Sequence, residues 1–569
     1  MRSRLVPPLA AAALLFACSE PQKEPDPTPP RPKITNLVED WRDEVVYQLL
    51  TDRFADGDPS NNQGVDLGSP VQWHGGDFKG IADRIPYLQA LGVTTVWISP
   101  VVKNVDRFGN GAGYHGYWTQ DFTAVEPHFG TRESLVAMID ALHAANIKVV
   151  LDVVTNHVGP LFFYDVNNDG RPDEDLQVDG YPDGRRRIHE PNPDFDWHGI
   201  RVPGSSSVLA PIVFFDDPST NRVAPQPPEF QNPDWYNRRG RTMDWGNGDQ
   251  VLYGDFPSGL KDLKTTHPDV RAALLRFYKG WMELDFDGFR LDTVKHVEHD
   301  SWIDFCRGIR SHAEKLGKKN FFLFGEALDG DHAKIGAYTK DESLDTLLNF
   351  PQKFIVDEVF RGKAAPKRLK EDYDTRKRTF ATTPSPGIGL AAWQSAVNFL
   401  DNHDLARFLA NGTRVEQLHA ALALLFLEEG VPAIYYGTEQ RFTGSTDPEN
   451  REDLWSSGYA QDGETFQWIA RLARLRKAYP ALRRGETVFR WASESATGAP
   501  DAGLVAFERL HGTQRVLVVV NASSQTSETS LAASGGEDMK TGFAELAPLK
   551  DALGGGSFVA GRDGRLKLR

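Results

Sequence analysis

The sequence has 569 residues, which is too many for one hydrophobic core and predicts two or three domains. Hydrophobic residues make up 40% and charged residues 25% of the chain, as in an ordinary soluble globular protein. The formal net charge of −15 argues against nucleic acid or an anionic membrane surface as a partner. It fits a neutral substrate, or cations held by clusters of carboxylates.

Residues 1–18 predict a signal peptide. Arg2 and Arg4 precede the apolar stretch Leu9–Ala17, which is too short to span a bilayer. The following Cys18 completes a bacterial lipoprotein-like cleavage box, so we expect export to the cell surface or periplasm with a lipid anchor on Cys18 as the only membrane attachment. An ordinary secretory signal, with Cys18 incidental, is the alternative. Cys306 is the only other cysteine, so the mature chain cannot form an intrachain disulfide.

Residues 19–39 are rich in proline and predict an extended linker. From residue 40 to 482, short β-branched runs alternate with amphipathic helical stretches such as 132–144, 270–283, 415–427 and 465–478, and this alternation predicts a parallel sheet. Eight such strands favour a closed (β/α)₈ barrel over an open sheet. The expected strands are Val45–Leu49, Val93–Ile98, Lys148–Val153, Phe289–Leu291, Phe321–Phe324, Asp345–Phe350, Val397–Leu400 and Ala433–Tyr436.

Two regions depart from this alternation. Residues 156–258 are rich in Pro, Gly, Asp and Asn and contain no expected helix; about a hundred such residues are too many for a plain loop and predict an inserted subdomain after the third strand. Residues 483–569 contain strand candidates at Gly503–Glu508 and Arg515–Val520. We expect a small C-terminal antiparallel β domain there, arranged as a sandwich.

Acidic and polar residues gather where the predicted barrel strands end. The segments are Asp152–His157, Gly288–His296, Phe324–Ala327 and Phe399–Asp404, at the third, fourth, fifth and seventh strands. In a (β/α)₈ barrel the carboxyl ends of the strands carry the catalytic groups. A single carboxylate there is usually a solvated loop acid. Carboxylates on several strand ends, most of them in segments that also contain His or Arg, indicate an active site.

These segments resemble the conserved regions of the α-amylase family of glycoside hydrolases. The resemblance extends to Gly75–Ile81 and Gly430–Glu439, and covers roughly residues 45–455 in family order. Within the family, Thr51–Asn62 and Tyr114–Trp118 look like the corresponding segments of bacterial α-amylases and cyclodextrin glucanotransferases.

The resemblance implies a set of catalytic roles. Asp292 matches the nucleophile, Glu326 the acid/base and Asp404 the transition-state carboxylate of a retaining mechanism. Arg290 lies two residues before Asp292 on one strand, so both side chains point the same way, and we expect the guanidinium to keep Asp292 ionised. Burial beside other carboxylates should keep Glu326 protonated.

The resemblance also implies substrate-binding residues. His157 and His403 match residues that hydrogen-bond the sugar being cleaved, and Tyr117 matches the ring that stacks on it. The other expected substrate-binding residues are Arg290, Lys295 and His296. A structural imidazole is the alternative for each histidine.

Three calcium sites are expected, all with oxygen ligands, as a hard cation prefers. By resemblance, the first ties the inserted subdomain to the barrel and the second is of the glucanotransferase type. The third is read from alternating oxygen-bearing residues around Gly170; it lacks the Glu of an EF-hand at its twelfth position, where Leu176 stands, and an acidic surface turn is its alternative. The ligand sets are Asn156, Asp262 and the His296 carbonyl; Asp56, Asp58, Asn61, Asn62, Gly75 and Asp77; and Asp165, Asn167, Asp169 and Asp173.

The expected protein is therefore a monomeric, calcium-dependent α-amylase-type hydrolase that cleaves α-1,4 bonds of starch and maltodextrins by double displacement. A cyclodextrin-degrading, transglycosylating or debranching relative is the nearest alternative. A non-catalytic surface glucan-binding lipoprotein is another, against which the complete carboxylate set speaks. Hydrolysis is expected over cyclisation, because Ser258 and Leu328 stand where cyclising relatives have aromatic rings. Replacement of the missing ring by Tyr253 or Phe256 is the alternative.

Overall fold

The computed structural model describes residues 34–171, 193–256, 259–529 and 538–568, together with the backbone of the short strands β10 (Leu176–Gln177) and β11 (Arg187–Ile188). The expected anchor Cys18, the expected calcium ligand Asp173 and the loop residue Ser258 lie outside these residues. No helix in the described part of the chain is long and apolar enough to cross a membrane.

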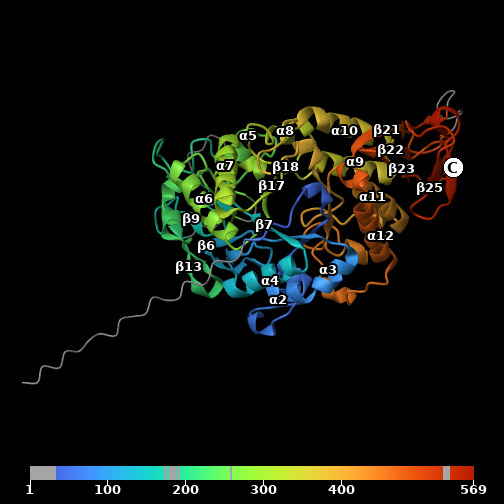
Figure 1. Cartoon of the computed structure of the whole chain (residues 1–569). Helices are drawn as coiled ribbons and strands as arrows, with labels where there is room; N and C mark the ends of the chain where they lie inside the picture. The colour runs from blue at the N-terminus through green and yellow to red at the C-terminus, as the bar shows by residue number, and fades with distance from the viewer. Residues whose placement is uncertain are drawn as a thin grey trace, which may run out of the picture.

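Eight parallel strands form the barrel, as predicted (Figure 1). Every pairing between neighbours is parallel, and a bridge between Leu348 and Val397 joins the two outer strands of the sheet. The interior residues of these strands are buried without exception, which suits a filled barrel. In spatial order the strands are β18 (Thr346–Leu347), β17 (Phe322–Gly325), β16 (Gly288–Leu291), β7 (Lys148–Val153), β2 (Thr95–Ile98), β1 (Val46–Leu49), β20 (Val431–Tyr435) and β19 (Val397–Phe399).

Amphipathic helices surround the strands (Figure 1). In α7 (His299–Leu316), Trp302, Phe305, Ile309 and Ala313 are buried at helical spacing, and Gly317 ends the helix in the left-handed region. The other helices of the barrel are α1 (Thr51–Phe54), α2 (Phe78–Asp83), α3 (Ile85–Leu91), α4 (Arg132–Ala144), α6 (Pro268–Met282), α8 (His332–Ala337), α9 (Phe350–Phe360), α10 (Lys367–Thr379), α11 (Val415–Leu427), α12 (Glu464–Ala478) and α13 (Pro480–Arg484).

The sixth strand is shorter than predicted. It comprises only Thr346 and Leu347, because Phe350 already begins α9. The apolar run that follows the strand packs as the first turn of a buried helix, and a run of that length does not distinguish the two states.

The inserted region is built from short paired strands and lies at the opposite side of the barrel from the C-terminal sheet in Figure 1. The expectation that it contains no helix is wrong: α5 spans Gly248–Tyr253, and its cap Asn247 accepts hydrogen bonds from Asp249 N and Gln250 N. A helix of six residues that begins with polar residues is too short for the spacing of its apolar residues to predict it. The strand pairs in and next to this region are β8 (His157–Val158) with β15 (Lys261–Asp262), β9 (Phe162–Tyr164) with β12 (Ile212–Phe214), and β13 (Asp216–Asp217) with β14 (Arg222–Val223); β3 (Val102–Asn104) with β6 (Thr119–Val125) and β4 (Arg107–Phe108) with β5 (Gly111–Ala112) precede it.

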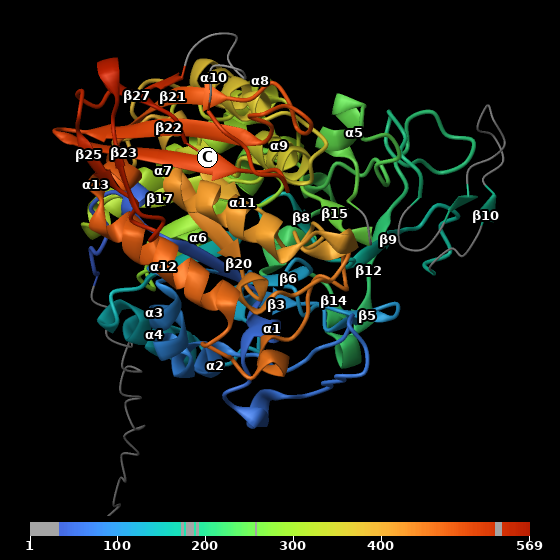
Figure 2. The same ribbon diagram turned by 90° about the vertical axis from the view of Figure 1, so that its right-hand side faces the viewer.

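The C-terminal region is antiparallel, as predicted. Its main sheet has the order β21-β22-β23, and Figure 2 shows this sheet in front of the barrel helices α9 and α11. The first strand, Glu486–Ala492, was not predicted. Arg509 on β22 donates to the carbonyl oxygen of Leu427 at the end of α11, which joins the sheet to the barrel. The remaining strands are β22 (Leu504–His511), β23 (Gln514–Asn521), β24 (Met539–Lys540) with β27 (Arg565–Leu566), and β25 (Pro548–Lys550) with β26 (Ser557–Val559).

The first described residues are held at the amino-terminal end of the barrel strands. Thr35 N donates to the Asp285 carboxylate just before β16, and Asn36 Nδ2 donates to Gly317 O at 2.9 Å. Trp41 Nε1 donates to Asn320 O at 2.7 Å, just before β17. The chain therefore joins the barrel at the end opposite to the predicted active site.

Candidate active site

The carboxyl ends of β7, β16, β17 and β19 open into a cleft of about 450 Å³. The cleft contains all three predicted catalytic carboxylates, Asp292, Glu326 and Asp404. It also contains every predicted substrate-binding residue except Arg290, which lies beneath its floor. The lining residues are His115, Tyr117, Trp118, His157, Trp245, Phe256, Leu260, Asp292, Thr293, Lys295, His296, Glu326, Leu328, His403, Asp404, Asp447 and Arg451.

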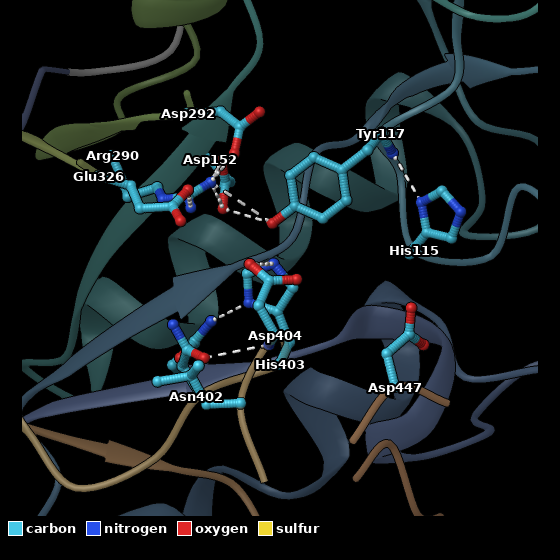
Figure 3. A network of polar contacts seen from close by, with 12 residues as sticks. His115, Tyr117, Asp152, Arg290, Asp292, Glu326, Asn402, His403, Asp404 and Asp447 are labelled. Carbon is cyan, nitrogen blue, oxygen red and sulfur yellow. Dashed lines mark hydrogen bonds and ion pairs between the residues drawn. The ribbon is translucent and has the colours of Figure 1, made fainter. Parts of the chain in front are cut away.

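Arg290 is the centre of the ion-pair network on the floor of the cleft, and it is fully buried. Its Nη1 lies 2.7 Å from Asp292 Oδ1 and 2.7 Å from Asp152 Oδ1, and its Nη2 donates to Glu326 Oε2. Figure 3 shows Asp152, Asp292 and Glu326 gathered around this guanidinium, with His403 and Asp404 across from them. The parallel register of the strands brings the three carboxylates to Arg290, because Arg290 pairs with Asp152 on β7 and with Phe324, two residues before Glu326, on β17.

Asp292 and Glu326 have different pKa values, and burial is the largest cause of both shifts. Burial raises the pKa of Asp292 to about 6; Arg290 opposes this shift, and Asp152 adds to it. Arg290 lowers this pKa, as expected of a guanidinium that favours the ionised form, but desolvation is the larger effect and leaves the pKa above its ordinary value. Burial, together with Asp292 and Asp404, raises the pKa of Glu326 to about 8. At neutral pH, Asp292 is ionised and Glu326 keeps its proton.

Tyr117, His157 and His403 form one wall of the cleft. The Tyr117 hydroxyl donates to Asp152 Oδ2 at 2.9 Å, and its ring stacks on His403 at 5.2 Å. Burial lowers the pKa of His157 to about 4, and its Nε2 donates to Tyr117 O at 3.2 Å. Gln48 Nε2 donates to His403 Nδ1 at 2.8 Å, which leaves Nε2 of His403 facing Asp404. Both imidazoles are therefore neutral hydrogen-bonding groups.

Asp404 is held differently from the other two acids. Its side chain is 35% exposed, and its carboxylate lies 3.2 Å from His403 Nε2 and 3.4 Å from Arg451 Nη2. The same Arg451 contacts Asp447 Oδ1 at 2.9 Å.

Lys295, His296 and two aromatic residues form another part of the cleft lining, and Phe256 stacks on His157 at 5.7 Å. Lys295 Nζ donates to Leu328 O at 2.9 Å, and His296 Nδ1 donates to Val251 O at 2.8 Å. Burial lowers the pKa of His296 to about 3, so the ring is neutral. Trp245 and Phe256 pack edge-on against His296, and Trp245 remains 47% exposed. A flat, exposed indole at a cleft edge is suited to contact with a sugar face.

Several residues in or beneath the cleft were not predicted from the sequence. Asp152, beneath the floor, stands in the same strand-end segment as His157, and that position could have identified it. Trp245 comes from the inserted region, where no local pattern indicated it. Of the two aromatic residues named as alternatives to the missing ring, Phe256 lines the cleft and Tyr253 does not. Asp447 and Arg451 lie on a loop after the eighth strand, and their proximity to Asp404 is visible only in the fold.

The first expected calcium site has a donor atom without a partner. Asn156 Oδ1 is buried and accepts no hydrogen bond from the described residues. Asp262 is 1% exposed and lies in β15, opposite His157 of β8, while Leu263 N donates to Asn156 O. Asn237 Nδ2 donates to Asp262 Oδ2 at 2.6 Å. A buried carboxylate beside an unpaired amide oxygen fits a cation.

The second expected calcium site also contains buried oxygen atoms without hydrogen-bond partners among the described residues. Asn61 Oδ1 and Asn62 Oδ1 are buried without a partner among the described residues. A Cβ at Gly75 would lie 2.6 Å from Asn62 Oδ1, so only glycine leaves this cradle open. Asp56 accepts from Asn62 Nδ2, while Asp58 and Asp77 cap the helices η2 (Pro59–Asn61) and α2.

The third expected site fits less well. Asp165 and Asn167 accept hydrogen bonds from Asp169 N, and Asp165 also accepts from Gly170 N, as in an ordinary acidic turn. The surface-turn alternative therefore accounts for the described part of this loop.

An unpredicted acidic cluster comprises Asp106, Glu126 and His128. Both ring nitrogens of His128 are already engaged, with Glu126 Oε1 at 2.6 Å and Gln63 O at 2.9 Å. This is a hydrogen-bonded ion pair that needs no metal.

Comparisons with known proteins agree with the resemblance of the motifs. Residues 48–457 match the family model for the catalytic domain of α-amylase. The α-amylase of Streptomyces lividans is 33% identical over 519 residues, which cover 82% of this chain and 53% of that relative. This chain thus spans about half the length of that protein. A cyclomaltodextrin glucanotransferase of Klebsiella oxytoca is 29% identical over 530 residues, which cover 85% of this chain and 70% of the relative.

A solved structure is similar over nearly the whole length. The α-amylase of Geobacillus thermoleovorans, complexed with acarbose, matches with a TM-score of 0.69 at 26% identity, covering 93% of this chain and 97% of the other.

Proposed function

Because this chain belongs to the α-amylase family of glycoside hydrolases, we propose that it hydrolyses α-1,4-glucosidic bonds of starch-like glucans with retention of configuration. The observation that carries the proposal is the pair of carboxyls on Arg290. Asp292 has a pKa of about 6 and Glu326 a pKa of about 8, so one is a base and the other an acid at neutral pH. A retaining glycosidase needs that pair.

The proposed reaction follows from this arrangement. Glu326 protonates the glycosidic oxygen while the Asp292 carboxylate attacks the anomeric carbon, and the bond to the leaving sugar breaks. Glu326, now ionised, takes a proton from water, which attacks the glycosyl-enzyme and restores free Asp292. Arg290 orients both carboxyls, and Asp404 faces the same space with a charge that favours the oxocarbenium-like transition state.

The proposal is tested with purified protein and soluble starch. We expect the chain to release reducing sugar, and Asp292→Asn and Glu326→Gln each to lower the rate at least 10²–10⁴-fold, roughly the contribution of one positioned acid or base. Glu428→Gln is a matched control, because burial also raises the pKa of Glu428 to about 8, but it precedes β20 at the other end of the barrel. Near-normal starch hydrolysis by the Asp292 or Glu326 variant would contradict the assignment.

Transglycosylation is a second candidate, favoured by one observation. Phe256 and Trp245 line the cleft, and aromatic walls of this kind shield a glycosyl-enzyme from water. In contrast, Leu328 stands where cyclising relatives have an aromatic ring, and its aliphatic side chain is 40% exposed, which favours hydrolysis. Chromatography of the products from starch distinguishes the two activities: linear maltooligosaccharides indicate hydrolysis, and cyclic or elongated products as a major fraction indicate transfer.

We also propose that calcium occupies the first two sites. The amide oxygens of Asn156, Asn61 and Asn62, which are buried without a partner among the described residues, support this, as does the resemblance of both ligand sets to calcium sites of the family. Asn156, Asp262 and the His296 carbonyl would hold one ion; the other ligand set is Asp56, Asp58, Asn61, Asn62, Gly75 and Asp77. When bound, the metal supplies structural order at the cleft edge. The neighbouring His157 and His296 side chains contact substrate.

Export and a lipid anchor at Cys18 are a further part of the proposal, supported by Arg2, Arg4 and the apolar stretch Leu9–Ala17. Labelling of the expressed chain with a radioactive fatty acid should mark the wild type and not Cys18→Ser. An unlabelled, fully soluble wild type would favour the ordinary secretory signal.

A further inference from the structure

Asp404 is the most exposed of the three catalytic carboxylates. Its side chain is 35% exposed, compared with 7% for Asp292 and 10% for Glu326, which both contact Arg290. Its ion pairs within the described chain are with His403 and Arg451, at 3.2 and 3.4 Å. The position of Asp404 over the substrate therefore depends on what holds these two partners.

Arg451 is held by three other groups. Its Nε donates to His403 O at 3.1 Å, and its Nη1 lies 3.1 Å from the Tyr114 hydroxyl and 2.9 Å from Asp447 Oδ1. A guanidinium is rigid and planar, so the partners of Nε and Nη1 determine where Nη2 points. Of these partners, Asp447 is 51% exposed, whereas Tyr114 is 3% exposed. The Tyr114 hydroxyl is thus the buried side-chain group that fixes the orientation of Arg451.

Tyr114 is in turn fixed by a second buried arginine. The guanidinium of Arg53 lies 4.0 Å from the centre of the Tyr114 ring, and Arg53 is 1% exposed. Arg53 donates to Asp52 at 2.9 Å and to the carbonyl oxygens of Pro70 and Gln72 at 3.0 and 2.7 Å. The chain of contacts therefore runs from the loop before Gly75, through two arginines and a tyrosine, to Asp404.

We propose that Tyr114 is a positioning residue for catalysis: its hydroxyl orients Arg451 and, through Arg451, Asp404, while Arg53 holds the tyrosine ring in place. This inference rests on the proposed glycosidase function. Tyr114 itself is absent from the cleft lining, so its effect on the reaction passes through Arg451.

The test is a double-mutant cycle between Tyr114→Phe and Asp404→Asn, measured with a chromogenic maltooligosaccharide. Phenylalanine keeps the ring under Arg53 and removes only the hydroxyl. We expect Tyr114→Phe to lower kcat about tenfold in the wild-type background, the rate effect of one hydrogen bond to a charged group, with less than about a twofold change in KM. In the Asp404→Asn background the same change should lower kcat less than about twofold, because its target is gone.

Tyr459→Phe is the matched control. The Tyr459 hydroxyl donates to Phe54 O, and Arg84 covers its ring, so the substitution also removes a hydroxyl from a tyrosine under an arginine. It should leave kcat unchanged in both backgrounds. Thermal melting of all variants accompanies the kinetics.

The outcomes separate this inference from the proposed function. If the wild type releases no product, the proposed function fails. If the wild type is active but Tyr114→Phe leaves kcat unchanged, or lowers it equally with and without Asp404, the positioning role of Tyr114 fails alone. A lower melting temperature without the loss of kcat would show that Tyr114 only stabilises the fold.

Discussion

Asp152 offers a sharp test of the electrostatics of the active site. It is fully buried and accepts hydrogen bonds from Arg290 Nη1 at 2.7 and 2.9 Å, from the Tyr117 hydroxyl at 2.9 Å and from Trp97 Nε1 at 3.1 Å. Asp152→Asn retains the shape of the side chain and removes its charge. Asp152 does not line the cleft, so the variant changes the field around the catalytic carboxyls without deleting either.

The two carboxyls should respond unequally. The Asp152 charge contributes to the raised pKa of Asp292, whereas the carboxylates that raise the pKa of Glu326 are Asp292 and Asp404. Burial raises the pKa of Asp152 itself to about 6, so its charge is fully present only above that pH. Removing this charge should therefore lower the pKa of Asp292 by at most about one unit, or about 1.4 kcal/mol, and change that of Glu326 less. Breaking a buried ion pair should also destabilise the fold by about 3 kcal/mol, near the lower end of such effects, because Arg290 keeps two carboxylate partners.

The assay is kcat/KM for a chromogenic maltooligosaccharide across the full pH range of stability. The wild type should rise to a plateau as Asp292 ionises near pH 6 and decline as Glu326 loses its proton near pH 8. In Asp152→Asn the rising limb should move to lower pH and the falling limb should stay, so that the profile widens on its acid side.

Asp287→Asn is the control for the loss of stability. Asp287 is also buried and paired, with His143 at 2.8 Å and Lys318 at 2.8 Å, but it lies before β16 at the other end of the barrel. It should lower the urea midpoint without moving either limb. A rising limb that stays in place or moves to higher pH in Asp152→Asn would refute the electrostatic argument.

Three further predictions concern metal, product and pH. Chelation with EDTA should lower the melting temperature and the activity, and calcium at a hundredfold excess over its dissociation constant should restore about 2.7 kcal/mol; an unchanged melting curve after complete chelation would remove the calcium sites. Leu328→Phe should raise the ratio of transfer to hydrolysis products, measured by chromatography, and Leu328→Ile should leave it unchanged; an equal ratio in both would contradict the shielding role of a ring there. Burial lowers the pKa of His143, but Asp285 and Asp287 outweigh burial and raise this pKa from 6.5 to about 9. The protonated ring should therefore add up to roughly 3 kcal/mol to the free energy of unfolding below pH 6.5, and this contribution should be lost as the pH rises through 9. Urea midpoints of the wild type and His143→Gln should therefore converge in alkali, and a constant difference would contradict this.

The elements that could be predicted from the sequence are those whose apolar spacing or motif lies within a few neighbouring residues. Lys148–Val153 and Arg132–Ala144 have the predicted bounds, because their apolar spacing has one interpretation. The strand-end segments place Asp292 and Glu326 on one guanidinium, because two parallel strands in register bring their ends together.

Other features depend on long-range packing. The contact between Arg451 and Asp404 joins positions 47 residues apart on two loops, and no spacing rule predicts it. The pKa of Asp292 depends on how completely the fold removes water, which a neighbouring arginine in the sequence does not reveal.

The attachment of the first described residues has a consequence for access to large substrates. Thr35, Asn36 and Trp41 are bonded to the connections before β16 and β17, while the cleft opens at the far ends of the same strands. The described chain therefore begins at the end of the barrel opposite to the cleft. A large substrate that enters the cleft approaches the barrel from the end that Thr35, Asn36 and Trp41 do not occupy, so these residues do not compete with it for space.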